Sequence, residues 1–490
     1  MGDSEDRFAA HDDRRLTIRT APRTGTMPRR DDAAATAPER AAKPVRSLPT
    51  HPMANRLARR FPAFGYRDYR LYWVGQLVSI SGRWMQTVAQ AWLVVDVLDA
   101  TPFQLSLITG IQFAPILLFG LFAGVVADRV PKRNLLIATQ VAMAALASIL
   151  AVLVATGTVA LWHVFLLALG LGIANAFDMP ARHAFVSEMV DRSAVMNAVA
   201  LNSAVFNSGR IIGPAIAGVL LAAFGPAICF TINALSFIAV IVALVRMRIR
   251  PVARPPTGSP LARLREGLGY VRATPDILRP ILLVGTIGVF GMNFNVWLPL
   301  LTRESFAAGA TTFGLLYAAM GIGSLSGALV LAAFGESPNR ARMYLTGLIL
   351  GAAELALAFA AAVPVGIALA MVCLAGVGFA TTSTTATANT IVQTTASDEL
   401  RGRVMAVYST VFAGTIPFGA LFAGAIAGRF GAPTSVALGG AVVAAGAVTI
   451  GVLERGRAAR AARESVTAAA TESAPAASAG LFPAPQRRRN

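Results

Sequence analysis

Residues that usually build enzyme sites are scarce in this chain of 490 residues. It has four histidines and two cysteines, Cys229 and Cys373, and none of them stands at the spacing of metal ligands. The nucleotide pattern G-x-x-x-x-G-K-[ST] and the zinc pattern H-E-x-x-H are both missing. We therefore expect no metal site, no cofactor and no enzymatic activity.

Charged residues are also few, because they make up 14% of the chain while 55% is hydrophobic and the mean hydropathy is +0.60. This balance excludes an ordinary soluble domain and predicts a multi-spanning membrane protein surrounded by lipid. The net charge of +18 comes almost entirely from arginines in the tails and in short loops. That distribution indicates membrane topology rather than a surface for nucleic acid. The arginine and alanine excess is typical of a GC-rich bacterial genome.

Twelve apolar runs are long enough to cross a hydrocarbon core of about 30 Å, which takes roughly 20 residues of helix. They cover approximately residues 69–97, 103–127, 134–157, 160–178, 195–224, 226–246, 279–301, 311–334, 342–361, 363–387, 403–428 and 432–453. Segments 1–60 and 454–490 lack the apolar residues of a packed core, so we expect two disordered tails.

Basic residues concentrate on every second loop. They include Arg129, Lys132 and Arg133 in the second loop, Arg182 and Arg192 in the fourth, and the arginines of the linker 247–278. By the positive-inside rule these loops and both termini are cytoplasmic, in the inner membrane of a bacterial cell. In the linker, apolar residues at helical spacing over 261–273 predict an amphipathic helix on the membrane surface.

The two halves, 61–246 and 279–453, share a pattern at an offset of 206 residues. It relates Ser203, Val205, Phe206, Gly213, Ala217, Gly218 and Gly225 to Ser409, Val411, Phe412, Gly419, Ala423, Gly424 and Gly431. Such a repeat is typical of duplicated secondary transporters. The sequence thus predicts an all-α integral membrane fold of twelve helices in two pseudo-symmetric six-helix repeats.

The second loop, GVVADRVPKRN at 124–134, resembles the G-x-x-x-D-R-x-G-R-[RK] loop between helices two and three of the major facilitator superfamily. Gly124, Asp128, Arg129, Lys132 and Arg133 fit this pattern, and Pro131 replaces its second glycine. The resemblance implies a conformational gate, in which Asp128 faces the start of helix eleven near Arg401 and Arg403. A carboxylate at a helix N-terminus is favourable by about 0.3–1 kcal/mol.

Four further segments resemble the exporter branch of that superfamily, which includes the enterobactin exporter and multidrug and macrolide efflux proteins. They are SGRWMQTVAQAWLV at 81–94, ANAFDMPARHAFV at 174–186, LNSAVFNSGRIIGPAIAG at 201–218 and NFNVWLPLL at 293–301. In the third segment, Gly209, Gly213, Pro214 and Gly218 resemble the helix-bending Gly-Pro motif of antiporters, although Ala200 replaces a usual glycine. Residues 162–177, in helix four, lack the arginine that the superfamily's drug/proton antiporters usually carry.

Polar residues recur every three or four positions in the first helix, which places Arg83, Gln86 and Gln90 on one face. A charge at this depth costs about 2.5–3.5 kcal/mol in lipid, so we expect this face to line a central substrate cavity. The alternative is that Arg83 pairs with a neighbouring helix or reaches outward, while the glutamines bond between helices.

Other helices contribute further candidates to the same cavity. Asn207 and Arg210 share a face of helix five, and Arg210 either meets an anionic or catechol-like substrate or forms a buried pair that locks the helices. Asn293 and Trp297 in helix seven are four residues apart and are also predicted to line the cavity. Gln112 in helix two is a weaker candidate.

Carboxyl groups able to carry protons are scarce within the spans. Asp96 and Asp178 lie near predicted helix ends, and Glu354 lies in helix nine. An acidic group within a span is a functional candidate by default, and the alternative for Glu354 is an interfacial side chain.

These observations favour a monomeric secondary transporter that exports a siderophore-like or drug-like molecule by alternating access, in exchange for protons. Two alternatives stay open, which are a metabolite importer of the same fold and a non-transporting membrane sensor or scaffold.

Overall fold

Apolar runs in a membrane leave the backbone no water to bond with, so each run satisfies its own N–H and C=O groups as a helix. The structure is a computed structural model that describes residues 61–248, 260–334 and 339–472. Within these ranges the chain forms helices joined by short turns and contains no strand. The predicted tail 1–60 and residues 473–490 lie outside the described residues.

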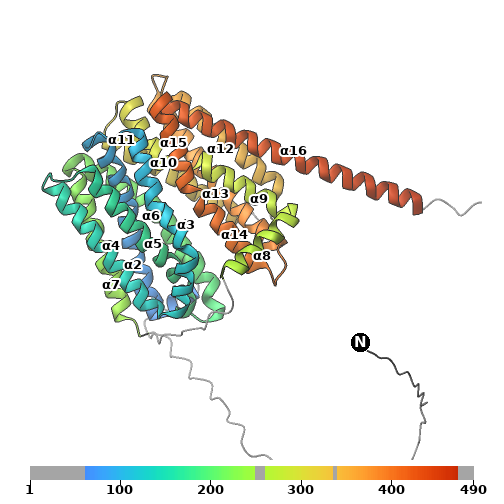
Figure 1. Cartoon of the computed structure of the whole chain (residues 1–490), viewed down its shortest axis with the longest axis horizontal. Helices are drawn as coiled ribbons and strands as arrows, with labels where there is room; N and C mark the ends of the chain where they lie inside the picture. Colours follow the sequence, from blue (N-terminus) through green and yellow to red (C-terminus); the bar gives the residue numbers. More distant parts are fainter. Residues whose placement is uncertain (1–60, 249–259, 335–338, 473–490) are drawn as a thin grey trace, which may run out of the picture. The chain divides into compact units, whose positions relative to one another are not determined.

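Six spans form the N-terminal half (Figure 1). They are α2 Arg67–Trp92 with the π-helical end η2 Leu93–Val97, α3 Pro102–Arg129, α4 Lys132–Ala155, α5 Leu161–Met189, α6 Val195–Phe224 and α7 Pro226–Arg246. Two short 3-10 turns, η1 Pro62–Gly65 and η3 Arg192–Ala194, precede α2 and α6. Helix α2 packs against both α6 and α7, which places its polar face inside this half.

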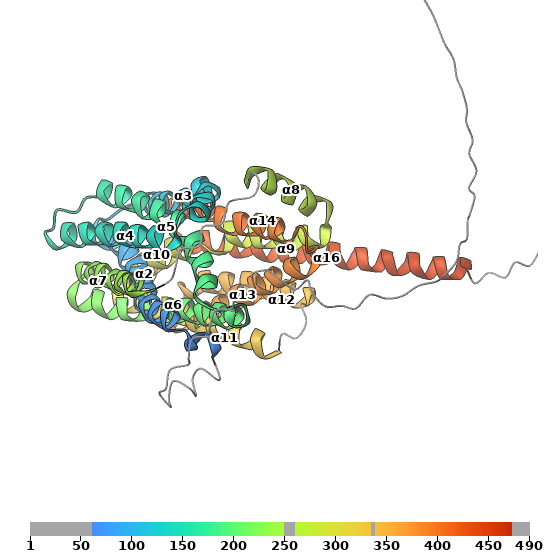
Figure 2. The same cartoon turned by 90° about the horizontal axis from the view of Figure 1, so that it is seen from below.

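The C-terminal half repeats this arrangement with more breaks. Its seventh span consists of α9 Pro275–Thr286, η4 Ile287–Gly291, α10 Phe294–Leu300 and η5 Leu301–Ser305; then follow α11 Ala310–Phe334, α12 Arg340–Ala360, α13 Gly366–Thr395, α14 Arg401–Gly414 with α15 Ile416–Phe430, and α16 Ala432–Glu472. The linker helix α8 Pro260–Ala273 lies against α14 (Figure 2).

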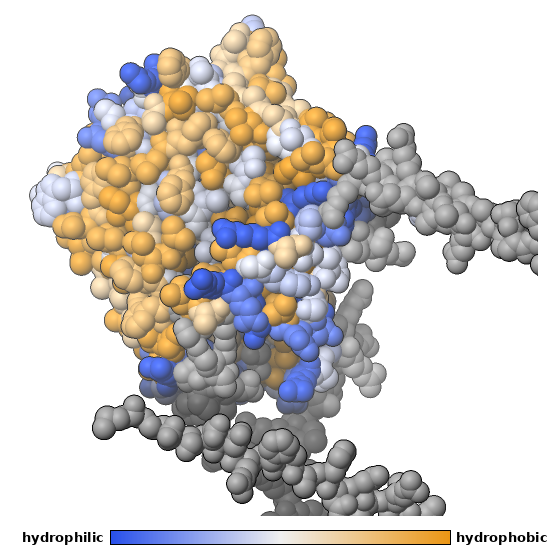
Figure 3. All heavy atoms as spheres, turned by 45° about the vertical axis from the view of Figure 1, so that its right-hand side comes forward, coloured by the Kyte–Doolittle hydropathy of each residue, from blue (hydrophilic) through white to orange (hydrophobic). Residues whose placement is uncertain are grey.

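Among the described residues, eleven helical segments are long and apolar enough to cross a membrane. The twelfth span is α2, whose polar and charged residues make it less apolar than the others. Hydrophobic side chains cover most of the molecular face in Figure 3, and hydrophilic ones gather at its upper left and lower edges. The predicted twelve-helix fold is confirmed.

Two helices extend beyond their predicted ends. Helix α5 continues to Met189 rather than ending at 178, because Ala181, Phe185 and Met189 recur at helical spacing and are all buried. Helix α16 continues to Glu472, so the expected disorder from residue 454 is wrong at its start. The alanines and arginines of this extension are strong helix formers without help from lipid.

Pairs of residues with left-handed backbone show how closely the halves repeat. Gly225 and Gly431 end α6 and α15 with φ values of +74° and +84°. Asp99 and Ala307 follow η2 and η5 with φ values of +45° and +48°. Non-glycine residues rarely adopt this conformation, so its recurrence at matching places supports the predicted duplication.

Close contacts between the halves gather near the end of the molecule where α2 gives way to α3. Gly218 on α6 packs against α11, so that a Cβ added to it would lie 2.8 Å from the Cα of Gly314. Gly424 on α15 packs in the same way against Ser106 on α3. An ion pair of 2.8 Å joins Asp96 in η2 to Arg303 in η5. We call this the closed end.

Toward the opposite end, which carries α8, α3 packs less extensively against α14 and α8 than it does against α15 near the closed end. A Cβ added to Gly124 on α3 would find no atom within 4 Å. On the same helix Leu118 and Phe122 are 71% and 60% exposed, and Asp128 is exposed as well. We call this the linker end.

Helices α11 and α13 approach each other closely because Gly378 on α13 has no side chain. A Cβ on Gly378 would overlap the carbonyl oxygen of Met320, so Gly378→Val should destabilise the fold by about 1–3 kcal/mol. The measurement is the thermal unfolding midpoint of the purified protein in detergent. Gly120→Val is the control, because a Cβ there meets no atom within 4 Å. Equal shifts for both variants would contradict this account of the packing.

Candidate functional site

A buried ion pair holds the N-terminal half together. Asp178 and Arg182, one turn apart on α5, are 1% and 6% exposed, and their side chains form an ion pair. Gln140 Nε2 and Thr139 Oγ1 of α4 donate to Asp178 Oδ1 at 2.8 and 3.0 Å. Arg182 also donates to Gln76 Oε1 of α2. The pair thus ties three helices together.

The placement of Arg182 corrects the sequence interpretation. The sequence predicts Arg182 to be a loop residue that sets membrane topology, whereas α5 continues past it to Met189, so helix four carries an arginine beyond residues 162–177. The residue lies inside α5 because Asp178 neutralises its charge, which lets the helix continue past both residues. Two opposite charges four residues apart were the signal available in the sequence.

Arg83 and Arg210 lie nearer the middle of the protein, on α2 and α6. Arg83 Nη1 donates to Asn175 Oδ1 of α5 at 3.5 Å, a long bond, and its Nε has no hydrogen-bond partner. Arg210 lies with its guanidinium carbon 5.8 Å from the ring centroid of Trp84, and its Nε is also without a partner. Buried arginine donors without acceptors are costly, so both side chains are available to a ligand.

Aromatic side chains surround the second of these arginines. The ring of Phe206 meets that of Trp84 edge to face with centroids 5.8 Å apart. Asn207, the neighbouring candidate on α6, donates its Nδ2 to the Ser203 carbonyl of its own helix at 2.9 Å. Cationic and aromatic groups side by side favour a flat or anionic organic molecule.

A small polar pocket lies between the halves near the closed end. Gln90 Nε2 of α2 donates to Gln112 Oε1 of α3 at 2.9 Å, and Asn295 of α10 completes the wall. Tyr317 Oη of α11 donates to Asn295 Oδ1 at 2.7 Å. The cavity volume is about 20 Å³, which suffices for about one water molecule. The pocket therefore belongs to the seal between the halves.

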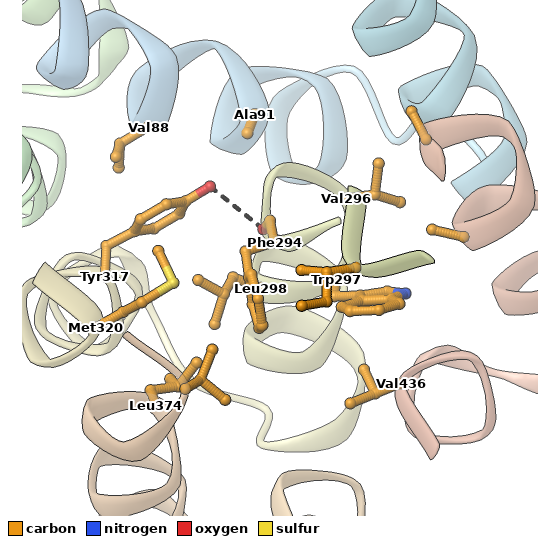
Figure 4. Packing of buried hydrophobic residues seen from close by; sticks show 14 of the residues in the cluster. Val88, Ala91, Phe294, Val296, Trp297, Leu298, Tyr317, Met320, Leu374 and Val436 are labelled. Carbon is orange, nitrogen blue, oxygen red and sulfur yellow. Dashed lines mark hydrogen bonds between the residues drawn. The ribbon is translucent and has the colours of Figure 1, made fainter. Parts of the chain in front are cut away.

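Three predicted cavity residues lie elsewhere. Trp297 is fully buried and donates its Nε1 to Ser435 Oγ of α16 at 2.9 Å, beside Val436 (Figure 4). Asn293 is 4% exposed and donates to the Val289 carbonyl. Gln86 is 6% exposed and accepts from Asn233 of α7. In this structure these side chains bond within one half and do not line an open cavity.

The residues of the predicted gate are separated. Lys132 Nζ pairs with Glu188 Oε1 at 2.7 Å, and Arg133 donates to backbone carbonyls at the end of α7. Arg401 pairs with Asp398, and Arg403 pairs with Glu266 of the linker helix. Asp128 and Arg129 are exposed, and the described residues offer them no ion pair. Pro131 is the N-cap of α4, where its missing N–H costs nothing.

The glycines of the antiporter-like motif let α6 approach its neighbours closely. A Cβ on Gly213 would lie 2.6 Å from the Ser81 carbonyl of α2, and one on Gly209 would lie 2.7 Å from Ile80. Pro214 is buried beside them, and Gly218 makes the inter-half contact already described. The motif thus brings α6 against both α2 and α11.

The three carboxyl candidates have different surroundings. Asp96 is paired with Arg303, and Asp178 is paired with Arg182. Glu354 on α12 is fully buried, and neither of its oxygens has a hydrogen-bond partner. Among the described residues, no three His, Cys, Asp or Glu side chains gather as metal ligands would.

A family model described as a transmembrane secretion effector matches residues 60–475 of this chain. The chain belongs to this family of the major facilitator superfamily. Relatives include the staphyloferrin A transporter of Staphylococcus aureus, 26% identical over 57% of this chain and 70% of that protein. The multidrug efflux pump Tap of Mycolicibacterium fortuitum is 29% identical over 72% and 88%, and macrolide efflux protein A of Streptococcus pyogenes is 22% identical over 60% and 74%.

Solved structures support the fold alone. A bacterial homologue of the human lysosomal transporter Spinster, in an inward-facing and unoccupied conformation, is 13% identical with a TM-score of 0.61. The match covers 79% of this chain and 95% of that one. A POT family transporter in complex with 5-aminolevulinic acid is 11% identical with a TM-score of 0.65, over 79% and 96%. The family match and the structural similarity therefore both indicate the major facilitator fold.

The buried pair of this facilitator protein gives a stability test. Asp178→Asn leaves Arg182 buried without a counter-charge and should lower the free energy of unfolding by about 3–5 kcal/mol. Adding Arg182→Gln removes the stranded charge and should recover part of that loss. The measurement is the thermal unfolding midpoint in detergent. A double variant no more stable than Asp178→Asn would show that the pair is not the source of the effect.

Proposed function

We propose that this transporter exports an organic molecule with anionic or other acceptor groups across the bacterial inner membrane, by alternating access and in exchange for protons. Staphyloferrin A, multidrug and macrolide transporters among its relatives support a small organic substrate and the outward direction. A single chain contains both six-helix halves, which supports a functional monomer.

The proposed substrate class rests on the surroundings of two arginines. The Nε groups of Arg83 and Arg210 are buried without acceptors, and Arg210 lies beside the Trp84 ring. Hydrogen bonds to a charged group contribute about 1.5–3 kcal/mol each, so a ligand that supplies oxygen acceptors would satisfy both arginines. The aromatic rings would meet its apolar part.

Arginine-rich loops support a cytoplasmic location for the linker end and both termini. In this proposal an exported molecule enters from the linker end, and the Asp96–Arg303 pair and the glycine crossings seal the outer end. Closure of the linker end would bring Asp128 toward Arg401 and Arg403, the gate that the family resemblance implies. These residues are free of one another in the open arrangement, as an opened gate requires.

Export can be measured in an efflux-deficient bacterial host that produces the protein. We expect cells loaded with a labelled macrolide, a dye or a siderophore to lose at least one of them faster than cells with the empty vector. Collapse of the proton gradient should stop the loss. Loss that continues after collapse would exclude proton exchange, uphill uptake would identify an importer, and no flux of any panel member would favour a sensor or scaffold.

Arg210→Gln should lower the export rate of the same compound about 10-fold or more, because it removes a charge-assisted bond to the substrate. Arg83→Gln should act in the same direction. The control is Arg272→Gln, which removes an exposed arginine from α8. Rates are compared at equal amounts of protein in the membrane. Wild-type rates in both site variants would refute the proposed arginine site.

A further inference from the structure

The side chain of Glu354 is the strongest unexplained feature of the C-terminal half. It is fully buried within α12, and both of its carboxyl oxygens lack hydrogen-bond partners. Its surroundings are small and apolar. A Cβ on Gly291 would lie 3.3 Å from Glu354 Oε1, and one on Gly440 would lie 2.8 Å from Glu354 Cβ. Gly291 belongs to η4 and Gly440 to α16, so three spans enclose the carboxyl.

No opposite charge reaches this site among the described residues. The helix α13 and the turn η4 contain no charged residue, and α12, α16, α9 and η5 carry theirs near the membrane surfaces. The charged residues nearest to the carboxyl along each element are Arg340 and Arg342 on α12, Glu454 and Arg455 as the first on α16, Asp276 and Arg279 on α9, and Arg303 and Glu304 on η5. Of them, Arg340 pairs with Asp276 and Glu454. Arg340 lies about 21 Å from Glu354 along α12, at 1.5 Å per residue.

Two further titratable groups belong to α12 itself and to α13, which packs against it. Tyr344 of α12 donates its hydroxyl to Glu454, and Cys373 is a buried thiol of α13. Neither bonds to Glu354. An ionised carboxylate in such a place would cost several kcal/mol, so the stable form in this state is the neutral acid. A metal cation would need several oxygen ligands, and among the described residues no three His, Cys, Asp or Glu side chains gather here.

The carboxyl lies against the seventh span, which is irregular at mid-depth. In η4, residues Ile287–Gly291 form a π-helical turn, and Met292 and Asn293 then leave helical geometry with φ values of −117° and −93°. The matching part of the first span lies within the continuous helix α2. Single π-helical turns inside α-helices are frequent at functional sites, and this one departs from the symmetry of the two halves.

The irregular part of the seventh span is followed directly by a residue at the interface between the halves. Asn295, four residues after Gly291, lines the closed-end pocket with Gln90 and Gln112. Tyr317 holds it there by donating to Asn295 Oδ1 at 2.7 Å. The same hydroxyl donates to the Phe294 carbonyl at 3.2 Å (Figure 4). One short irregular segment therefore touches the carboxyl on one side and the seal on the other.

We propose that Glu354 is the proton-binding site of the transporter, and that the broken seventh span couples its protonation to the seal at Asn295. This inference rests on the proposed export function and identifies the residue that exchanges the proton. One proton converts the carboxylate to the neutral acid, which the apolar site accepts. Its release to the cytoplasm restores a charge that the closed site cannot hold, so the span must move before the cycle continues.

Proton binding can be observed without any substrate. In infrared difference spectra of the purified protein in lipid, the wild type should show the C=O band of a protonated carboxyl near pH 7, where exposed carboxyl groups are ionised. Glu354→Gln should lose that band, whereas Glu399→Gln, which removes an exposed carboxyl, should keep it. A band that survives in Glu354→Gln would overturn the assignment.

Transport in proteoliposomes tests the coupling. With a labelled macrolide as the probe, Glu354→Gln should lose proton-driven accumulation at least 10-fold while it still exchanges macrolide across the membrane, and Glu354→Asp should restore part of the accumulation. Full accumulation by Glu354→Gln, or accumulation by the wild type on a sodium gradient alone, would overturn the proposal. If the proposed export function is wrong, the result is different from a failure of the Glu354 assignment. The wild type would then not transport the macrolide, but its infrared band would still be present and would still be lost in Glu354→Gln.

Discussion

The cost of an unpaired charge inside a membrane governs the interior of this protein. Asp178 and Arg182 meet that cost by pairing with each other, and amides from two further helices complete their hydrogen bonds. Arg83, Arg210 and Glu354 do not meet it, since each keeps a buried polar atom without a partner. The first pair therefore stabilises the fold, while the other three are the residues to which we assign ligands. We propose a substrate for the two arginines and a proton for the carboxyl.

The two kinds of site lie in different halves. Both unpaired arginines belong to the N-terminal half, and the unpaired carboxyl belongs to the C-terminal half. The seventh span, with its π-helical turn, lies against the carboxyl and also contributes Asn295 to the interface. Duplication of a six-helix unit produced two similar halves. The proposed proton site lies where the second half departs from the first, at the π-helical turn of the seventh span.

The existence of the helices could be predicted because lipid imposes their length, and the repeat followed from small residues at matching positions. The C-terminal end of α5 could not be predicted, because two charged residues favour a loop unless it is known that they pair with each other. Asn293 and Trp297 do share a side of their span, but the π-helical turn before them changes the phase of the helix. That shift turns both residues inward and presents Asn295 to the interface, which no regular periodicity would indicate.

The two glycine crossings near the closed end bring helices of the two halves into close contact. Gly218 meets Gly314 on one side, and Gly424 meets Ser106 on the other, at positions related by the internal symmetry. Backbones that touch without side chains between them can roll over each other with little repacking. In the proposed transport cycle this end must also open, and contacts made without side chains would let the two halves change their mutual angle here without repacking.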